Sequence, residues 1–355
     1  MRPSSWLVVG AVAIVALLAV LDALRGAAGS TAGPSPTETN AGIHRFEQNG
    51  PPAIRGRGAL EARLLRAGIG GTLFLTDETC RLRVLLLPAL EWLSQTSTPH
   101  GTCDFAVAPD ARRVQFGSGV AWSPDGRLAA RCASDGIHVF SRTGTVAERL
   151  RGLCAPAWKP DGTFTAARGA VLVERRLFCR GGGLACESMV LGGDDLAPAL
   201  RGGSTPFRTL YSPVIKEAIW LDDARVALVV RARVREEEGV ELDLLALYEG
   251  RRLVAEPQVN RGFDDPAVSP SGRYLAIYGS TFRGLFFLDR NGRLLARNPL
   301  ASGHHAAWSP DERWTLVATG GSAYFFRTRD LARFASSRRP ETIRIPVYAA
   351  DLDWR

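Results

Sequence analysis

Short apolar runs, broken by glycine, aspartate and proline, follow one another along most of the chain from about Arg57 onward. Examples are TLFLTD, LRVLLLPAL, IHVFSRTG, LDLLALYEG and SAYFFRTRD. Runs of this kind, rich in branched and aromatic side chains and bounded by turn residues, are typical of β-strands. Helical periodicity is weak, and only Asp194–Leu200 predicts a short helix. The pattern therefore predicts an all-β fold.

One stretch, AWSPDGRLAA at 121–130, recurs in variant form along the chain. Within it Ala121 and Trp122 end one strand, Pro124 and Asp125 shape a tight turn, and Gly126 is free to adopt a positive φ. The stretch therefore predicts an antiparallel hairpin. Its relatives are AVAPDARRVQ, AWKPDGTFTA, IWLDDARVAL, AVSPSGRYLA and AWSPDERWTL, which begin at Ala106, Ala157, Ile219, Ala267 and Ala307.

A large apolar side chain occupies the same place in every copy, which we call the ring slot: Val107, Trp122, Trp158, Trp220, Val268 and Trp308. Repeats of roughly 40 to 50 residues are typical of four-stranded propeller blades, in which such a group fills the wedge between neighbouring sheets. The copy containing Asp110 follows too closely to be a blade of its own and is assigned to the strands before it. The sequence predicts a six-bladed β-propeller with blades near 69–116, 119–150, 154–200, 215–257, 263–299 and 304–345.

The chain ends in YAADLDWR, which repeats the approach to the hairpin, with Trp354 in the ring slot, and stops before the turn. Such a strand is suited to complete the first blade and to close the ring, which would remove an exposed sheet edge. A seventh blade shared between the termini is the alternative.

The N-terminal segment differs from the rest. Trp6–Leu21 contains no charged residue and is intermediate in length between a membrane span and the apolar part of a cleaved signal. We expect a signal anchor or signal peptide at 1–25, with the anchor as the favoured form and secretion after cleavage as the alternative. Residues 26–56 are rich in Gly, Ala, Pro, Ser and Thr and predict a flexible linker before the propeller at 57–355.

The six cysteines are even in number and include no Cys-x-x-Cys pair. This usage favours disulfides in an oxidising compartment over a zinc or redox site. Fifteen pairings are possible, and we expect neighbours in sequence to pair; buried free thiols are the alternative. The expected disulfides are Cys80–Cys103, Cys132–Cys154 and Cys179–Cys186.

The net charge of +8 comes almost entirely from arginine, since Lys159 and Lys216 are the only lysines. Acidic residues are interspersed throughout and no basic run is long, so the charge predicts a solvated basic surface and no nucleic-acid partner.

The hairpin WSPDG at 122–126, with its relatives, resembles the repeat of TolB-type, WD-repeat-like β-propellers over most of residues 69–354. That family includes exported bacterial scaffold proteins and the propeller domains attached to prolyl-oligopeptidase-type hydrolases. The resemblance implies a propeller fold, export and a binding role, with the motif residues serving structure.

No motif of catalysis accompanies these repeats. The sequence has no Gly-x-Ser-x-Gly, no phosphate loop, no dinucleotide fingerprint and no His-Glu-x-x-His. His304 and His305 are adjacent, so on a strand they point to opposite faces and do not readily bind one ion. We therefore expect no enzyme, no cofactor and no metal site.

One constellation remains as a candidate ligand-binding site. Three residues before each ring slot, where the innermost strands open into a central channel, the sequence has Asp104, Gly119, Ala155, Glu217, Asp265, His305 and Asp351. The acidic groups and the imidazole among them could bind a ligand or exchange protons. Ordinary solvated residues paired with arginine are the alternative.

The favoured function is a membrane-tethered, extracytoplasmic β-propeller that binds an envelope protein or another ligand through its faces. The alternative is a small lactonase- or lyase-like propeller enzyme that uses the channel carboxylates, and a third is a structural envelope component without a small ligand. An exposed apolar or arginine-aromatic patch, for instance around Phe282–Phe287, would favour the first.

Overall fold

The computed structural model describes residues 53–97, 102–179, 183–205, 208–281, 284–297, 303–319, 321–335 and 341–355. The chain divides into the units Met1–Ile43 and His44–Arg355, and the described residues all belong to the second. The predicted anchor at 1–25 and the linker up to residue 52 lie outside them. Among the helices of the described part, none has the length and apolar character needed to cross a membrane.

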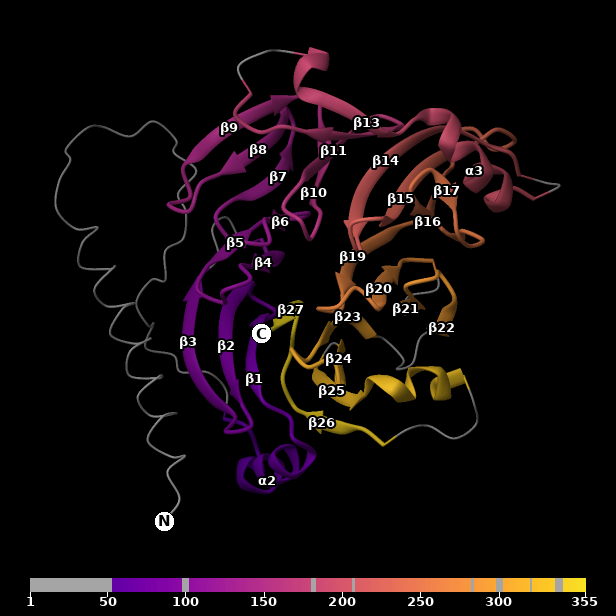
Figure 1. The fold of residues 1–355 in the computed structure, drawn as a ribbon. Coiled ribbons are helices and arrows are strands. Elements are labelled where there is room, and N and C mark those ends of the chain that lie inside the picture. Colours follow the sequence, from indigo (N-terminus) through magenta and orange to yellow (C-terminus); the bar gives the residue numbers. More distant parts are fainter. Residues whose placement is uncertain are drawn as a thin grey trace, which may run out of the picture. The chain divides into compact units, whose positions relative to one another are not determined.

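Antiparallel sheets make up most of the described chain (Figure 1). Sheet 1 has the order β27 (Asp351–Trp354), β1 (Gly71–Thr76), β2 (Arg81–Leu87), β3 (Glu91–Ser97). Sheet 2 comprises β6 (Ala121–Trp122), β7 (Ala129–Ala133), β8 (Gly136–Phe140) and β9 (Val146–Arg151). Sheet 3 comprises β10 (Cys154–Trp158), β11 (Phe164–Arg168), β12 (Val171–Arg175) and β13 (Glu187–Leu191).

The remaining large sheets follow in chain order. Sheet 4 comprises β14 (Leu210–Trp220), β15 (Arg225–Val234), β16 (Glu241–Glu249), β17 (Arg252–Leu253) and β18 (Gln258–Asn260). Sheet 5 comprises β19 (Phe263–Val268), β20 (Tyr274–Gly279), β21 (Gly284–Asp289) and β22 (Leu294–Arg297). Sheet 6 comprises β23 (Gly303–Trp308), β24 (Trp314–Thr319), β25 (Ser322–Arg327) and β26 (Ile343–Ile345). Between sheets 1 and 2, β4 (Phe105–Val107) and β5 (Val114–Phe116) form a sheet of two strands, the β4–β5 hairpin.

Neighbouring sheets pack face to face through apolar cores. Leu85 of sheet 1 shares a core with Phe325 of sheet 6, and Val139 of sheet 2 shares one with Ala166 of sheet 3. The sheets follow one another around a centre to which each presents its first strand (Figure 1). This arrangement is that of a β-propeller, so the all-β prediction is confirmed.

The predicted closure of the ring is confirmed. β27 pairs antiparallel with β1, with Leu73 opposite Trp354. The Trp354 indole donates to the Gly70 carbonyl at 3.0 Å and packs edge-on against Phe325, with ring centroids 5.2 Å apart. The C-terminal strand therefore occupies the innermost position of sheet 1.

The assignment of the Asp110 copy to the first blade is wrong. Because β27, β1, β2 and β3 already make four strands, the hairpin at 105–116 does not join them and pairs only with itself. Sheet 4 also extends beyond its expected start, since β14 begins at Leu210.

The repeated turn has the local chemistry that its sequence implies. The Ser123 hydroxyl donates to Asp125 at 2.7 Å, and the same carboxylate accepts the Arg127 amide at 3.0 Å. Gly126 donates its amide to the Ser123 carbonyl and has φ 64°. Side-chain hydrogen bonds thus fix a turn that only a residue tolerant of positive φ can close.

Helices are few in the described part. The helix expected at Asp194–Leu200 is present as the 3₁₀ turn η3 (Gly193–Leu196) followed by α3 (Ala197–Gly203). The helix α2 (Arg57–Ala67) was not expected, because strands were predicted from Arg57. It is mostly exposed, so it has little of the apolar periodicity by which helices are found. The 3₁₀ helices η2 (Gly183–Cys186) and η4 (Thr328–Ala335) complete the set.

All three expected disulfides are confirmed: Cys80–Cys103, Cys132–Cys154 and Cys179–Cys186. The first ties sheet 1 to the segment before β4, and the second ties β7 of sheet 2 to β10 of sheet 3. Two of the three crosslinks therefore join neighbouring positions in the ring.

The exposed patch around Phe282–Phe287 that would favour a binding scaffold is not formed by the described residues of that stretch. Leu285, Phe286 and Phe287 on β21 are at most 1% exposed, and Phe287 packs against Trp308 of sheet 6. Both faces of β21 are covered by neighbouring sheets, which explains why its apolar side chains do not alternate with polar ones.

Candidate functional site

A cavity of about 700 Å³ lies where the innermost strands meet. The strands β4, β6, β10, β14, β19, β23 and β27 all contribute to its lining. Each of the described sheets, including the two-stranded one, therefore presents one strand to the same central space.

The structure brings the predicted ring together. All five of its ionisable members line this cavity, as do Gly119 and Ala155 at the equivalent positions: Asp104, Glu217, Asp265, His305 and Asp351. Counting back from the ring slot therefore located residues that line the cavity, on or just before every innermost strand. Whether the cavity binds a ligand stays a prediction.

The backbone at this level is unusual. The equivalent residues Gly119, Ala155 and Asp265 have φ of 63°, 50° and 52°. β10 and β19 also shift register at this level, between Cys154 and Ala157 and between Asp264 and Ala267. A β-bulge redirects the side chains of its strand, here at the wall of the central cavity.

His305 lies between two carboxylates from different sheets. Its Nδ1 is 3.6 Å from Asp265 Oδ2 on β19 and 3.6 Å from Asp351 Oδ1 on β27. Asp351 also accepts the Phe105 amide at 2.9 Å and its neighbour's amide, from Leu352, at 2.7 Å. Three strands distant in sequence thus converge on one imidazole.

Burial sets the protonation of this group. The His305 side chain is 12% exposed, and burial, with a smaller contribution from His304, lowers its pKa to about 4. Burial raises the pKa of Asp351 well above its usual range, against the opposing hydrogen bond from Phe105. At neutral pH the imidazole is therefore uncharged, and burial shifts the pKa of the Asp351 carboxyl in the direction that favours its protonated form.

Two further carboxyls of the cavity titrate near neutrality. Burial raises the pKa of Glu217 to about 7, opposed by Lys216, and no hydrogen bond satisfies its buried Oε2. Asp265 is surrounded by protein, although water reaches 41% of its side chain. This desolvation, together with nearby Asp104, raises its pKa to about 6.

Sequence reasoning missed the charged neighbours of this ring. Lys216 and Asp264 also line the cavity, with Lys216 Nζ 3.7 Å from Asp264 and 3.0 Å from Asp243. Asp243 is fully buried and accepts two hydrogen bonds from Arg231, at 2.8 and 3.2 Å. These residues lie outside the ring position, so the spacing rule did not identify them.

Metal binding finds no support in the described part of the chain, where no group of three or more His, Cys, Asp or Glu side chains is arranged to hold an ion. The imidazole is flanked by carboxylates at 3.6 Å, which exceeds a direct hydrogen bond. The imidazole and the two carboxyls could exchange protons with a ligand placed between them.

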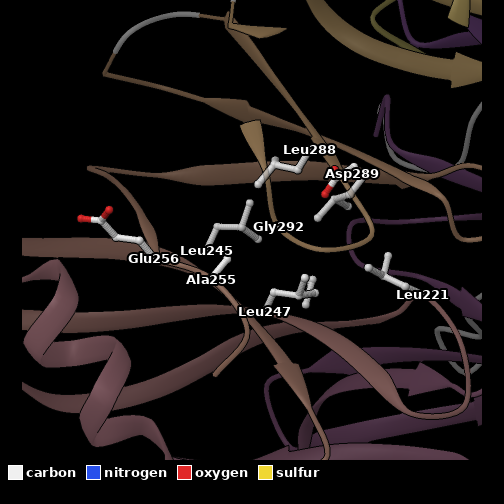
Figure 2. Close-up of a pocket in the computed structure, with 10 residues that line it drawn as sticks. Leu221, Leu245, Leu247, Ala255, Glu256, Leu288, Asp289 and Gly292 are labelled. Carbon is white, nitrogen blue, oxygen red and sulfur yellow. The ribbon is translucent and has the colours of Figure 1, made fainter. Parts of the chain in front are cut away.

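Two other cavities lie away from this ring. One of about 10 Å³ lies between sheets 4 and 5, and half of its lining residues are leucines, among them Leu245, Leu247 and Leu288 (Figure 2). It has room for about one water molecule and is a packing defect. Another, of about 450 Å³, lies beside β12 and β13, where Arg175 pairs with Glu187 at 3.4 Å.

Comparisons with known proteins bear on the fold alone. No protein-family model and no curated protein matches the sequence. Solved structures that match include TolB from Acinetobacter baumannii, with 16% identity, a TM-score of 0.40, and 80% of this chain and 66% of that chain covered. This chain thus spans slightly under two thirds of that TolB.

Two further matches are more distant in sequence. AztD from Citrobacter koseri has 8% identity and a TM-score of 0.45, with 81% of this chain and 98% of that chain covered. The dihydro-heme d1 dehydrogenase NirN has 10% identity and a TM-score of 0.45, with 79% and 74% covered. The order of the chain's own sheets and their shared central cavity make it a β-propeller.

Proposed function

We propose that this protein is an extracytoplasmic binding scaffold, tethered to a membrane by its N-terminal segment. The observation that carries the proposal is the central cavity, whose charged lining is supplied by separate strands of a crosslinked ring. Disulfides persist in oxidising compartments, which supports a place outside the cytoplasm. A ring of this kind holds binding groups in fixed positions without any catalytic step.

The proposal includes a count of positions in the ring. Seven innermost strands line the cavity, and six of them begin or complete a sheet of at least four strands. We assign seven positions, of which the β4–β5 hairpin is a truncated one. This assignment replaces the six-bladed reading and differs from a seventh blade shared between the termini, since the hairpin is internal to the chain.

In-cell crosslinking tests the scaffold. The full-length tagged protein is purified from native membranes after crosslinking, beside a control chain that ends at Pro52. A reproducible partner that requires the propeller supports a scaffold. Recovery of the same proteins with both chains, at matched expression, would contradict it. Recovery of the tag in the soluble fraction would contradict tethering alone.

A second candidate is a small enzyme that performs proton transfer, such as a lactonase or lyase. It is favoured by the carboxyls of Glu217 and Asp265, whose pKa values of about 7 and about 6 suit general acid and base chemistry at neutral pH. A panel of lactones would be assayed with the wild type, Glu217→Gln and Asp265→Asn. Turnover that is lost in both variants while folding is retained would support the enzyme, and no turnover across the panel would contradict this activity.

A further inference from the structure

The β4–β5 hairpin differs from every other sheet in having only two strands. β4 lines the central cavity like the other innermost strands, but β5 has no described strand on its outer side. Elsewhere in the ring, two further strands continue outward from this position. The hairpin lies between sheets 1 and 2 (Figure 1), and the outer edge of β5 is one that no described strand covers.

The register defines which backbone groups face outward. Gly117 donates to the Asp104 carbonyl and Ala108 donates to the Arg113 carbonyl, with Phe105 opposite Phe116 and Val107 opposite Val114. In an antiparallel ladder, bonds placed in this way join the residues on either side of a pair. The N–H and C=O groups of the pair itself then point away from the partner strand. The amides and carbonyls of Val114 and Phe116 therefore point outward. The Phe116 carbonyl accepts a bond of 3.3 Å from the Arg131 side chain.

Sheet 2 turns a basic face toward this edge. Arg131, His138 and Arg149 lie opposite one another across β7, β8 and β9, so they share one face. Leu150 packs toward sheet 3, so its neighbours Arg149 and Arg151 point the other way. Both arginines are exposed, Arg149 by 60% of its side chain.

An acidic side chain contacts this basic face. Asp135 bonds to His138 at 2.8 Å and lies 3.7 Å from Arg149. The exposed charged side chains named on this sheet are thus two arginines, Arg149 and Arg151, and one aspartate, Asp135.

Sheet 1 turns an apolar face toward the hairpin. Leu73, Leu75 and Leu85 belong to the core shared with sheet 6, so Phe74 and Val84, opposite one another, lie on the other face. This other face is the one beside the hairpin, because Thr76, two residues after Phe74, donates to the Cys103 carbonyl at 2.8 Å. Both Phe74 and Val84 are less than 9% exposed.

We infer that the open edge of β5 binds an extended peptide segment, in which apolar and acidic residues alternate, as an added strand. A strand pairing with Val114 and Phe116 would direct alternate side chains to opposite sides of the edge. One set would extend the apolar face of sheet 1, and the other would meet the arginines of sheet 2. The inference rests on the proposed binding role and names the class of partner for one site of the ring.

A synthetic peptide tests the site directly. A short, N-acetylated, fluorescent peptide of alternating glutamate and valine is titrated with the full-length protein, and anisotropy reports binding. Val114→Pro removes the outward amide while leaving the bonds to β4, and it should abolish binding. Val114→Ala keeps that amide and is the matched control. Equal binding by the Val114→Pro variant and the wild type would overturn the inference.

Charge reversal gives a second variant that does not alter the backbone. Arg149→Glu should weaken binding of the acidic peptide about threefold to tenfold and favour a peptide with lysine in place of glutamate. Arg127→Glu, at a turn of the same sheet where the side chain is 80% exposed, is the control and should leave binding unchanged. Equal losses in the two variants would contradict a site at the hairpin edge.

Amide hydrogen exchange supplies a readout specific to strand addition. Peptide binding should slow exchange at Val114 and Phe116 and leave Gln115, which already faces β4, unaffected. The crosslinking experiment separates this inference from the scaffold proposal. A partner captured equally by the wild type and the Val114→Pro variant would overturn the β5 site and retain the scaffold, whereas no partner for either would contradict the scaffold.

Discussion

Individual glycines fix close contacts between the repeated turns and their neighbours. Gly272 closes the turn after β19 with φ 69°, and a Cβ there would lie 1.7 Å from the Leu221 carbonyl oxygen of sheet 4. Gly162 has φ 89° in the related turn after β10, and a Cβ there would meet nothing within 4 Å. Both positions have a positive φ, but only at Gly272 would a Cβ collide with neighbouring backbone atoms.

Alanine substitution separates the two effects. Gly162→Ala should lower the free energy of unfolding by about 1 to 2 kcal/mol, the usual cost of a left-handed conformation for a side-chain-bearing residue. Gly272→Ala should cost clearly more, because the backbone of sheet 4 has to move. Denaturant melts of both variants check this, and equal losses would show that the contact with Leu221 is unimportant.

Ionisation of Glu217 makes the free energy of unfolding depend on pH. Its pKa is about 7 in the folded protein and 4.5 in an unperturbed glutamate, so the folded state resists its ionisation. The protonated Glu217 side chain makes its full contribution to the free energy of unfolding below about pH 4.5. This contribution is lost as the pH rises through 7. Glu217→Gln does not ionise, so its stability relative to wild type should rise by about 2 to 3 kcal/mol between pH 4.5 and pH 8.

Melting of wild type and Glu217→Gln at several pH values measures this difference. His305 titrates in both proteins, and its lowered pKa acts in the opposite direction, with stability lost as the pH falls through about 4. The contribution of His305 therefore cancels when the free energy of unfolding of one protein is subtracted from that of the other. A difference that does not change with pH would contradict the raised pKa of Glu217.

At the scale of elements, the short C-terminal strand β27 closes the ring by pairing with β1. Trp354 is 3% exposed, packs on Phe325 of sheet 6 and donates to Gly70 before β1. Trp354→Ala should therefore lower the free energy of unfolding by about 3 to 5 kcal/mol. Trp122→Ala is the matched control, since this partly exposed ring-slot residue lies in a hairpin that is closed locally, and its loss should be smaller. Thermal melts of the two variants measure which substitution lowers stability more, and an equal or larger loss for Trp122→Ala would contradict the prediction.

The disulfide between β7 and β10 ties two sheets together. Cys132 and Cys154 are 22 residues apart in sequence, and a crosslink over that distance removes roughly 3 kcal/mol of unfolded-state entropy. Replacing both cysteines by serine should lower stability by about 2 to 4 kcal/mol. A second pair, Cys179 and Cys186, is only 7 apart, so its removal should cost less. Equal midpoints in denaturant for the two double variants would contradict the entropic argument.

The elements that could be predicted from the sequence are those that local interactions determine. The turn at Ser123–Gly126 could be recognised because its own side chains close it. The cysteines could be paired because each one bonds to its neighbour in sequence. The isolation of the β4–β5 hairpin could not be predicted in the same way. It depends on β27 occupying sheet 1, which is a contact between opposite ends of the chain.

The candidate site shows the same division. The ring position could be counted from the repeat, which located His305 and Asp265. The pairing of Lys216 with Asp243 could not, because it joins β14 to β16 of the same sheet and depends on a register shift between Ile215 and Glu217. Protonation could not be predicted either, since it follows from how deeply each carboxyl is buried.

For the whole molecule, the closure of the ring by β27 determines when folding can finish. β1 forms near the start of the described chain, yet its partner strand contains Trp354, next to the last residue. During synthesis, the first sheet therefore keeps an unpaired inner edge until residues 351–354 have been made. The ring closes only once β27 has reached β1, so a variant chain cut before Asp351 would leave the inner edge of β1 free to pair with other chains.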